Sequence, residues 1–183
     1  MAIRILSMIP GSAHQRRCRG LLAIGIILLL ASPAAADRHA CQTVLRVYDG
    51  DTVLVSTDTG KRLIRLLGID APETSKTRGQ TGQPFSSRAR RYLTRRIQDR
   101  CVQLKSYGTD RYNRILAVIT LEGVDINLEM VVQGLAEVYR GRPPEGFDRR
   151  PYRRAQETAR RERRGMWIQE AAYRSPMEWK HGR

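Results

Sequence analysis

Three runs rich in β-branched and aliphatic residues follow one another in the first half of the chain. The runs are residues 43–48, 52–56 and 62–69. Short polar breaks, Asp49-Gly50 and residues 57–60, separate them. Runs of this length bounded by Gly, Asp and Thr are typical of strands joined by tight turns. The pattern therefore predicts a three-stranded antiparallel meander over residues 43–69.

The spacing of apolar residues changes to a helical one further along the chain. Apolar side chains recur at every fourth position, at Phe85, Ala89, Leu93 and Ile97. Arginines fill the other faces of this segment, and Pro84 stands where a helix can begin. The pattern predicts an amphipathic helix over residues 85–99.

The remaining chain predicts two more strands and two more helices. Strand-like runs cover 102–106 and 115–121, and apolar spacing from Leu128 predicts a short helix ending near Gly134. An arginine-rich helix is expected over 148–164, closed by Gly165-Met166-Trp167. Five strands with interspersed helices, three strands first, fit an α+β class: a small β-barrel with three helices.

The first 36 residues differ in composition from the rest. Four arginines and no acidic residue precede an uninterrupted apolar run from Leu21 to Ala31, and small residues follow it up to Ala36. This order is that of a secretory signal peptide cleaved near Ala36. The run is shorter than the roughly 20 residues of a membrane span, although an uncleaved membrane anchor remains the alternative.

These features divide the chain into a signal peptide (1–36), a folded domain (37–170) and a short C-terminal tail (171–183). We expect export to the periplasm or the medium, with only transient membrane association through the signal segment. Lys and Arg number 33 against 18 Asp and Glu, and removing the four arginines of residues 1–36 lowers the net charge from +15 to about +11. Such a charge favours a polyanionic partner, either nucleic acid or an anionic membrane or cell-wall surface.

Outside the signal segment, the chain has two cysteines, Cys41 and Cys101. An even pair in an oxidising compartment suggests one disulfide. Two separate buried thiols fit the same count, so the pairing stays open at this point.

Acidic residues gather around the predicted turns of this basic chain. Antiparallel pairing about the second polar break sets Asp51 opposite about Leu67. That places Asp51 at the same end of the hairpin as Asp70 and Glu73, with Arg65 close by. Crowded carboxylates repel one another and need a cation, and oxygen-only ligands favour Ca²⁺ or Mg²⁺. Each residue, taken alone, also fits a turn, a strand end or an ordinary surface position.

Two familiar metal sites do not fit the sequence. An EF-hand loop read from Asp49 would need a bidentate Glu at its twelfth position, where Gly60 stands. A zinc site lacks ligands, because the histidines outside the signal segment are His39 and His181 and the cysteines are distant in sequence.

The order and spacing of five motifs add information that the single residues lack. The motifs are VYDGDTV (47–53), IRLLGIDAPE (64–73), TDRYNR (109–114), VVQGLAEVY (131–139) and RRGMW (163–167). This series resembles the staphylococcal nuclease family from about Val44 to Trp167. The resemblance implies a five-stranded OB-type β-barrel with three helices. It also implies a Ca²⁺-dependent phosphodiesterase that hydrolyses DNA and RNA and leaves 3′-phosphate ends.

The resemblance also implies a metal site and a general base. By position, Asp51 and Asp70 would be Ca²⁺ ligands, together with the backbone carbonyl oxygen of Ala71. Glu73 would orient or deprotonate the attacking water. Ala71 stands where the family archetype has threonine, but only a main-chain oxygen is needed there.

The resemblance further assigns residues to the substrate. Arg65 and Arg114 would hold the scissile phosphate. Asn113 replaces the glycine that precedes the second arginine in the archetype, and a turn tolerates Asn because Asn visits positive φ more readily than most residues. Tyr112 and Tyr139 match aromatic positions around the nucleotide pocket, although each fits ordinary packing equally well.

The family topology places the first and fourth strands side by side, which would bring Cys41 near Cys101. We expect a monomer with no obligate protein partner and a preference for single-stranded nucleic acid. The alternative is a catalytically inactive OB-fold module that binds single strands. Such a module is expected to lack some of the five principal site residues, yet all five are present: Asp51, Arg65, Asp70, Glu73 and Arg114. The low aromatic content of 6% also disfavours a dedicated stacking platform.

Overall fold

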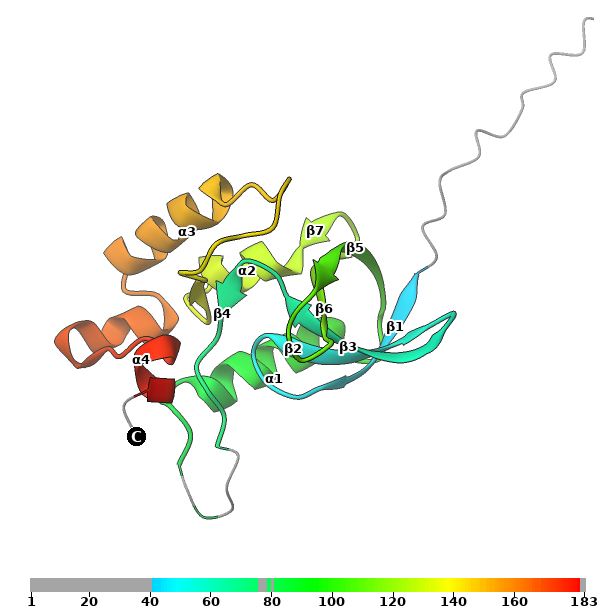
Figure 1. Cartoon of the computed structure of the whole chain (residues 1–183). Coiled ribbons are helices and arrows are strands. Elements are labelled where there is room, and N and C mark those ends of the chain that lie inside the picture. Colours follow the sequence, from blue (N-terminus) through cyan, green and yellow to red (C-terminus); the bar gives the residue numbers. More distant parts are fainter. Residues whose placement is uncertain (1–40, 76–78, 80, 182–183) are drawn as a thin grey trace, which may run out of the picture. The chain divides into compact units, whose positions relative to one another are not determined.

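A sheet in the order β3-β2-β1-β5-β6-β7 forms the centre of the computed structural model, which describes residues 41–75, 79 and 81–181 (Figure 1). Its strands are β1 (Gln42–Val47), β2 (Thr52–Thr57), β3 (Gly60–Leu66), β5 (Cys101–Thr109), β6 (Ile115–Leu121) and β7 (Val124–Asp125). β3 also pairs in parallel with β6, so the five longer strands close on themselves. The predicted OB-type barrel is confirmed.

The predicted meander is present, but its third strand ends earlier than expected. β2 and β3 meet at a two-residue turn, with Thr57 paired to Gly60. β3 stops at Leu66 because Gly68 takes a φ of +82°, and the ring of Phe147 occupies the space that a Cβ at this position would need. The chain then forms β4 (Ile69–Asp70), which pairs antiparallel with β8 (Glu137–Val138).

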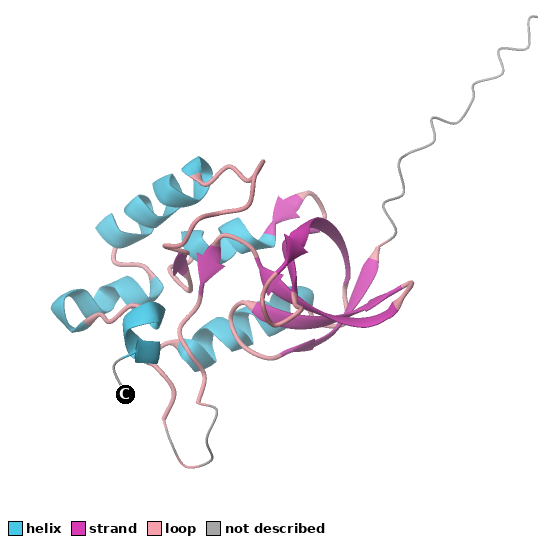
Figure 2. Ribbon diagram, in the orientation of Figure 1, coloured by secondary structure: helices cyan, strands magenta, loops and turns pink. Residues whose placement is uncertain are grey.

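The three predicted helices are present; the first and third are slightly shorter than expected, and the second begins and ends about two residues earlier (Figure 2). They are α1 (Ser86–Ile97), α2 (Ile126–Val132) and α3 (Arg150–Arg161). Residues with positive φ lie just beyond two of these helices, Asp99 (59°) after α1 and Arg163 (52°) after α3. A left-handed residue cannot continue a right-handed helix.

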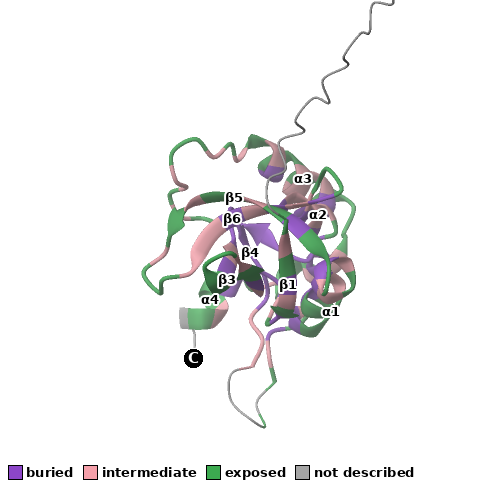
Figure 3. Cartoon of the chain, turned by 90° about the vertical axis from the view of Figure 1, so that its right-hand side faces the viewer, coloured by how far each residue is buried: buried purple, intermediate pink, exposed green. Residues whose placement is uncertain are grey.

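The inward faces of the strands and one face of α1 make the core (Figure 3). Fully buried strand residues include Val44, Val53 and Ile64, and Leu93 of α1 packs with them. Burying a side chain of this size stabilises the fold by about 1.5–3 kcal/mol. α1 therefore covers one face of the barrel.

The buried side chain of Asn127 ties α2 to the barrel. Its Oδ1 accepts from the backbone N–H of Ile119 at 3.1 Å. Its Nδ2 donates to the carbonyl oxygens of Leu67 at 3.0 Å and Ala117 at 2.9 Å. These bonds satisfy the backbone where β3 ends, and so help to fix the segment that carries Asp70.

Cys41 and Cys101 form a disulfide, with their Cα atoms 5.4 Å apart. Next to it, Gln42 pairs with Val102 in the antiparallel ladder between β1 and β5. In the chain-entropy model, a bridge across about 60 residues stabilises a fold by roughly 4 kcal/mol.

Residues 171–183, which we expected as a short tail, contain further helical structure. η1 (Gly165–Ala172) is followed by α4 (Pro176–His181). The expected signal segment, residues 1–36, lies outside the described residues. Within the part of the chain that the structure describes, no helix has the length and apolar character needed to cross a membrane.

Candidate active site

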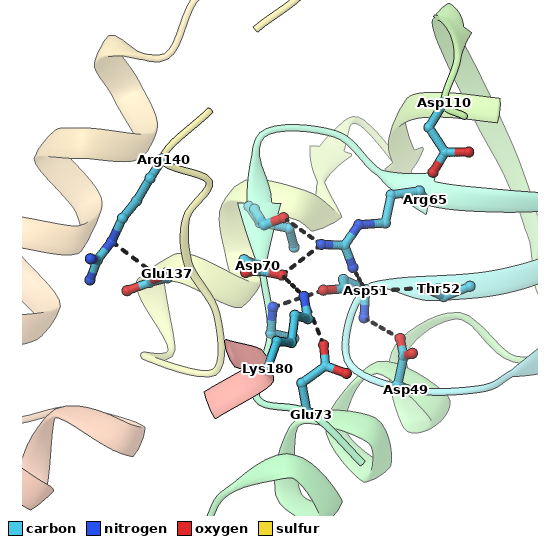
Figure 4. Close-up of polar contacts among 12 residues, drawn as sticks. Asp49, Asp51, Thr52, Arg65, Asp70, Glu73, Asp110, Glu137, Arg140 and Lys180 are labelled. Carbon is cyan, nitrogen blue, oxygen red and sulfur yellow. Dashed lines mark hydrogen bonds and ion pairs between the residues drawn. The ribbon is translucent and has the colours of Figure 1, made fainter. Parts of the chain in front are cut away.

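Asp51 and Asp70 approach one another around the guanidinium of Arg65 (Figure 4). Arg65 Nη2 donates to Asp70 Oδ1 at 2.7 Å, and Nη1 forms an ion pair with Asp51 Oδ1. Both carboxylates are buried, with Asp51 2% and Asp70 4% exposed. Three of the five principal residues are thus in direct contact, and they come from the β1–β2 turn, β3 and β4.

The backbone of the β1–β2 turn packs closely against neighbouring residues, and this packing holds Asp51 in place. A Cβ on Gly50 would lie 2.6 Å from the Cβ of Ala71 and 2.8 Å from that of Ala89. Asp49 Oδ1 accepts from the backbone N–H of Asp51 at 3.0 Å. The stretch is therefore both a turn and part of the site, since Asp49 braces the backbone and Asp51 points inward.

The side chain of Asp51 also contacts the segment after β4. Its Oδ2 accepts from the backbone N–H of Ala71 at 2.8 Å. Its main-chain carbonyl accepts from Leu66 at 2.8 Å, so the hairpin register lies one residue from the predicted partner, Leu67. The difference arises because the β2–β3 turn is centred between residues 58 and 59. Asp51 remains at the end of the hairpin that carries Asp70.

The surroundings of Asp49 shift the pKa of its carboxyl group. Burial raises the pKa of its carboxyl, and the positive charge of Arg65 opposes the shift. The side chain lines the site cavity beside Arg65.

Hydrogen bonds between the backbone of Glu73 and Gln83 hold Glu73 in place. Its N–H donates to Gln83 Oε1 at 3.0 Å, and its carbonyl oxygen accepts from the N–H of Gln83 at 2.8 Å. Gln83 is buried, and its Nε2 donates to the carbonyl oxygen of Arg174 at 2.7 Å. One glutamine thus fixes Glu73 and links it to the C-terminal segment.

Sequence reasoning missed Lys180, which lies in the site. Its Nζ lies 3.1 Å from Asp70 Oδ1 and 2.9 Å from Glu73 Oε1 (Figure 4). A local signal for its helix does exist in the sequence, because Ser175-Pro176-Met177-Glu178 has the spacing of a capping box with Pro at the first helical position. That signal predicts a helix but not its contact with the site.

Arg114 lines the same cavity as Arg65 but contacts a different carboxylate. Its Nε donates to Asp110 Oδ2 at 2.8 Å. Asp110 Oδ1 accepts from the backbone N–H groups of Tyr112 and Arg114, and Asn113 takes a φ of +59° as the turn requires. Burial raises the pKa of Asp110, but the hydrogen bonds from Arg114 and Tyr112 outweigh it and leave the pKa below its usual value. Asp110, another residue that we did not predict, orients Arg114.

The site opens into a cavity of about 870 Å³. Tyr112 and Tyr139 line it and are 64% and 45% exposed. The guanidinium of Arg114 lies 5.5 Å from the centre of the Tyr112 ring. Both predicted aromatic residues therefore present ring surface at the cavity, while Arg140 and Arg149 add positive charge to its wall.

A buried carboxylate that we did not predict, Glu137, lies next to Asp70 in the β4–β8 ladder. Its Oε2 accepts from the hydroxyl of Tyr173 at 2.7 Å, and Arg140 Nε lies 3.5 Å from its Oε1. Burial raises the pKa of Glu137, against the hydrogen bond from Tyr173. Because β8 gives no alternating pattern in the sequence, no local signal marks Glu137 as buried.

The residues present fit a hard divalent cation. Asp51 and Asp70 supply buried carboxylate oxygens beside the main chain of Ala71, and these are the donors that Ca²⁺ and Mg²⁺ prefer. Among the described residues, no three His, Cys, Asp or Glu side chains stand at the mutual distances of a metal cluster. Asp51 and Asp70 are therefore the side chains that would hold such an ion.

Similarity to known proteins gives independent information on this chain. Residues 63–169 match the family model described as "Staphylococcal nuclease homologue". A Haemophilus influenzae protein named "Uncharacterized endonuclease" is 32% identical over 161 residues, covering 87% of this chain and 83% of that protein. "Micrococcal nuclease" of Shigella flexneri is 34% identical over 170 residues, with 87% and 90% covered.

A yeast relative matches a shorter stretch of the chain. "Probable endonuclease LCL3" of Saccharomyces cerevisiae is 39% identical over 124 residues, which is 64% of this chain and 44% of that protein. The matched family region includes Arg65, Asp70, Glu73 and Arg114 and begins after Asp51. The chain therefore belongs to the staphylococcal nuclease family and is a nuclease.

Proposed function

We propose that this nuclease is a Ca²⁺-dependent phosphodiesterase that cleaves DNA and RNA and leaves 3′-phosphate ends. The observation that carries the proposal is the convergence of Asp51, Arg65, Asp70 and Glu73 at one cavity edge, with Arg114 on the same wall. The convergence supports metal-assisted attack of water on a phosphodiester, because it combines hard oxygen donors, a base and two guanidiniums.

Asp51, Asp70 and the carbonyl oxygen of Ala71 would hold the ion in this proposal. When bound, Ca²⁺ supplies positive charge next to a non-bridging phosphate oxygen and the attacking water. Asp51 is well placed for such a task, since its backbone and Oδ2 are both fixed by hydrogen bonds. A fixed ligand does not need to reorganise when charge develops.

Glu73 is the proposed general base. Its backbone is fixed by Gln83, its Oε1 lies 2.9 Å from Lys180 Nζ, which also contacts Asp70, and the residue lines the cavity. From there Glu73 accepts the proton of the attacking water, as general-base catalysis requires a carboxylate within hydrogen-bond reach. The bond that breaks joins phosphorus to the 5′ oxygen, which takes a proton from solvent and leaves as a 5′ hydroxyl, so the phosphate stays on the 3′ end.

Arg65 and Arg114 are the proposed phosphate ligands. A guanidinium has five N–H donors in a planar fork, so Arg65 can keep one bond to Asp70 while other donors face a phosphate. Asp110 holds Arg114 in one orientation, which lowers the entropy lost on binding. Two arginines then offset the charge that builds on the phosphate oxygens.

The cavity wall supports nucleic acid as the substrate and single strands as its preferred form. Tyr112 and Tyr139 offer exposed rings on which bases can stack, and Arg140 and Arg149 lie where flanking phosphates would run. We further propose an exported monomer without an obligate protein partner. The signal-like segment and the disulfide support export.

The test is digestion of single-stranded DNA by three preparations: protein with Ca²⁺, protein with a calcium chelator, and Glu73→Ser with Ca²⁺. We expect the chelator to abolish cleavage and Glu73→Ser to lower the rate by about 10²- to 10⁴-fold. Glu122→Gln is the matched control, because Glu122 is exposed and pairs with Arg100 away from the site. Equal cleavage in all preparations would contradict the mechanism.

The chemistry of the ends is tested on the same products. Fragments with 3′-phosphates cannot be extended by a polymerase until a phosphatase has removed the phosphate. Extension without phosphatase treatment would show 3′-hydroxyl ends and reject that part of the proposal.

A further inference from the structure

Lys180 occupies the position between two carboxylates that the proposed reaction uses. Its ammonium bridges Asp70 Oδ1 at 3.1 Å and Glu73 Oε1 at 2.9 Å. One is the proposed metal ligand and the other the proposed base. A compact ammonium is a point charge with three donors and no acceptor, so it can pair with both carboxylates at once.

Lys180 lies near the end of α4, and hydrogen bonds fix the start of this helix. Ser175 is fully buried, its backbone N–H donates to Glu178 Oε2 at 2.9 Å, and its Oγ accepts from the N–H of Glu178 at 3.1 Å. This reciprocal pair is a capping box that starts α4. The helix therefore projects Lys180 from a fixed base.

A second set of contacts attaches the segment to the site itself. Gln83, which clamps the backbone of Glu73, donates to the carbonyl oxygen of Arg174 at 2.7 Å. On the other side, Arg140 Nη1 lies 3.5 Å from Glu178 Oε1. The position of α4 is thus coupled to the backbone of the proposed base.

The segment follows the region that the family model matches. The family match ends at residue 169, whereas the capping box and Lys180 follow it. Met177 and Lys180 also line the wall of the 870 Å³ cavity, so α4 narrows the site that the substrate would enter.

We propose that α4 is an autoinhibitory element and that Lys180 is a built-in cation competing with the divalent metal for Asp70. This inference rests on the proposed metal-dependent function. Asp70 Oδ1 already contacts Arg65 at 2.7 Å and Lys180 at 3.1 Å, so a divalent ion beside Asp70 would be a third cation there, and it binds when Lys180 leaves. The ammonium then becomes free to face a substrate phosphate.

The expected change in Ca²⁺ affinity depends on the fraction of molecules in which Lys180 stays on Asp70. The apparent dissociation constant equals the intrinsic one divided by the fraction of open molecules. If roughly one molecule in ten to one in a hundred is open, removing the Lys180 charge tightens Ca²⁺ binding about 10- to 100-fold.

The experiment measures Ca²⁺ binding by isothermal titration calorimetry on the full-length chain and three variants. Lys180→Gln removes the charge, Lys180→Arg retains a cation, and Lys61→Gln is the matched control at an exposed lysine in β3. We expect Lys180→Gln to bind Ca²⁺ at least about 10-fold more tightly than the wild type. Lys180→Arg and Lys61→Gln should stay within about threefold of it.

A second readout follows α4 directly. Hydrogen exchange of the backbone amides of residues 177–181 should quicken when Ca²⁺ is added to the wild type, because the metal displaces Lys180. In Lys180→Gln the same amides should exchange quickly with and without Ca²⁺.

The outcomes separate this inference from the proposed function. Equal or weaker Ca²⁺ binding by folded Lys180→Gln would overturn the competition while leaving the metal site intact. If neither the wild type nor Lys180→Gln binds Ca²⁺, both the metal dependence and the competition are wrong.

Discussion

Two clusters of acidic and basic side chains in this protein differ in how completely their charges are paired. Between α1 and α2, Glu129 accepts from Arg96 Nε at 2.7 Å and Nη2 at 2.9 Å, and from the hydroxyl of Tyr92. At the site, the three carboxylates of Asp51, Asp70 and Glu73 share two cations, Arg65 and Lys180.

The difference separates a structural ion pair from a functional cluster. Glu129 has a forked partner of its own and joins two helices. The site instead has an excess of carboxylate next to a cavity, in a chain that is otherwise strongly basic. Unbalanced negative charge is costly to gather, and a place for another cation compensates for it. The ratio of cations to carboxylates in each cluster, rather than the presence of ion pairs, distinguishes the two.

The largest effect should come from removing Arg65, the cation that Asp51 and Asp70 share. Arg65→Ala should lower kcat/KM for single-stranded DNA by about 10²- to 10³-fold, because it removes a preorganised donor to the phosphate. Steady-state kinetics at saturating Ca²⁺ measure this loss. Arg96→Ala, which removes an arginine from the structural pair, should leave kcat/KM within about twofold at a temperature where it stays folded. A similar loss of activity in both variants would erase the distinction between the clusters.

A smaller effect should follow from breaking the structural pair. Glu129→Gln should lower the free energy of unfolding by about 1–2 kcal/mol, because the charged hydrogen bonds of Glu129 are lost at a half-buried position. Urea unfolding measures the change. Glu122→Gln, at the exposed pair with Arg100, should change stability by less than about 0.5 kcal/mol. Equal losses in the two variants would show that burial does not strengthen the Glu129 pair.

The smallest effect is a pH dependence of that same pair. Hydrogen bonds from Arg96 lower the pKa of Glu129, while burial raises the pKa of Tyr92 to about 12. A lowered carboxyl pKa gives stability that is present above the ordinary value of 4.5 and is lost as the pH falls through the folded value. A raised tyrosine pKa gives stability that is present below 10 and is lost as the pH rises toward about 12.

Unfolding free energies of the wild type and Glu129→Gln, measured across these two ranges, test the signs. Their difference should shrink on the acid side, where Glu129 becomes protonated. A difference that stays constant down to the acid-unfolded state would show that the Glu129 charge does not contribute.

Much of the barrel could be predicted because it depends on local patterns. The alternating runs marked β1, β2 and β6 to within a residue, since a strand exposes alternate side chains to opposite faces. The end of β3 could not be predicted in the same way. It depends on Gly68 making room for Phe147, a residue 79 positions further along the chain.

For the candidate site, too, some features could be predicted from the sequence and others could not. The sequence alone identified the family and the motif order and predicted the five principal residues, because these lie in short segments with characteristic spacing. Only the tertiary structure decided which groups share which cations. Lys180 reaches Asp70 across 110 residues, through a helix attached by Gln83 and a buried Ser175. A local pattern can predict such a helix, but it carries no information about the surface on which the helix packs, since that depends on contacts between distant segments.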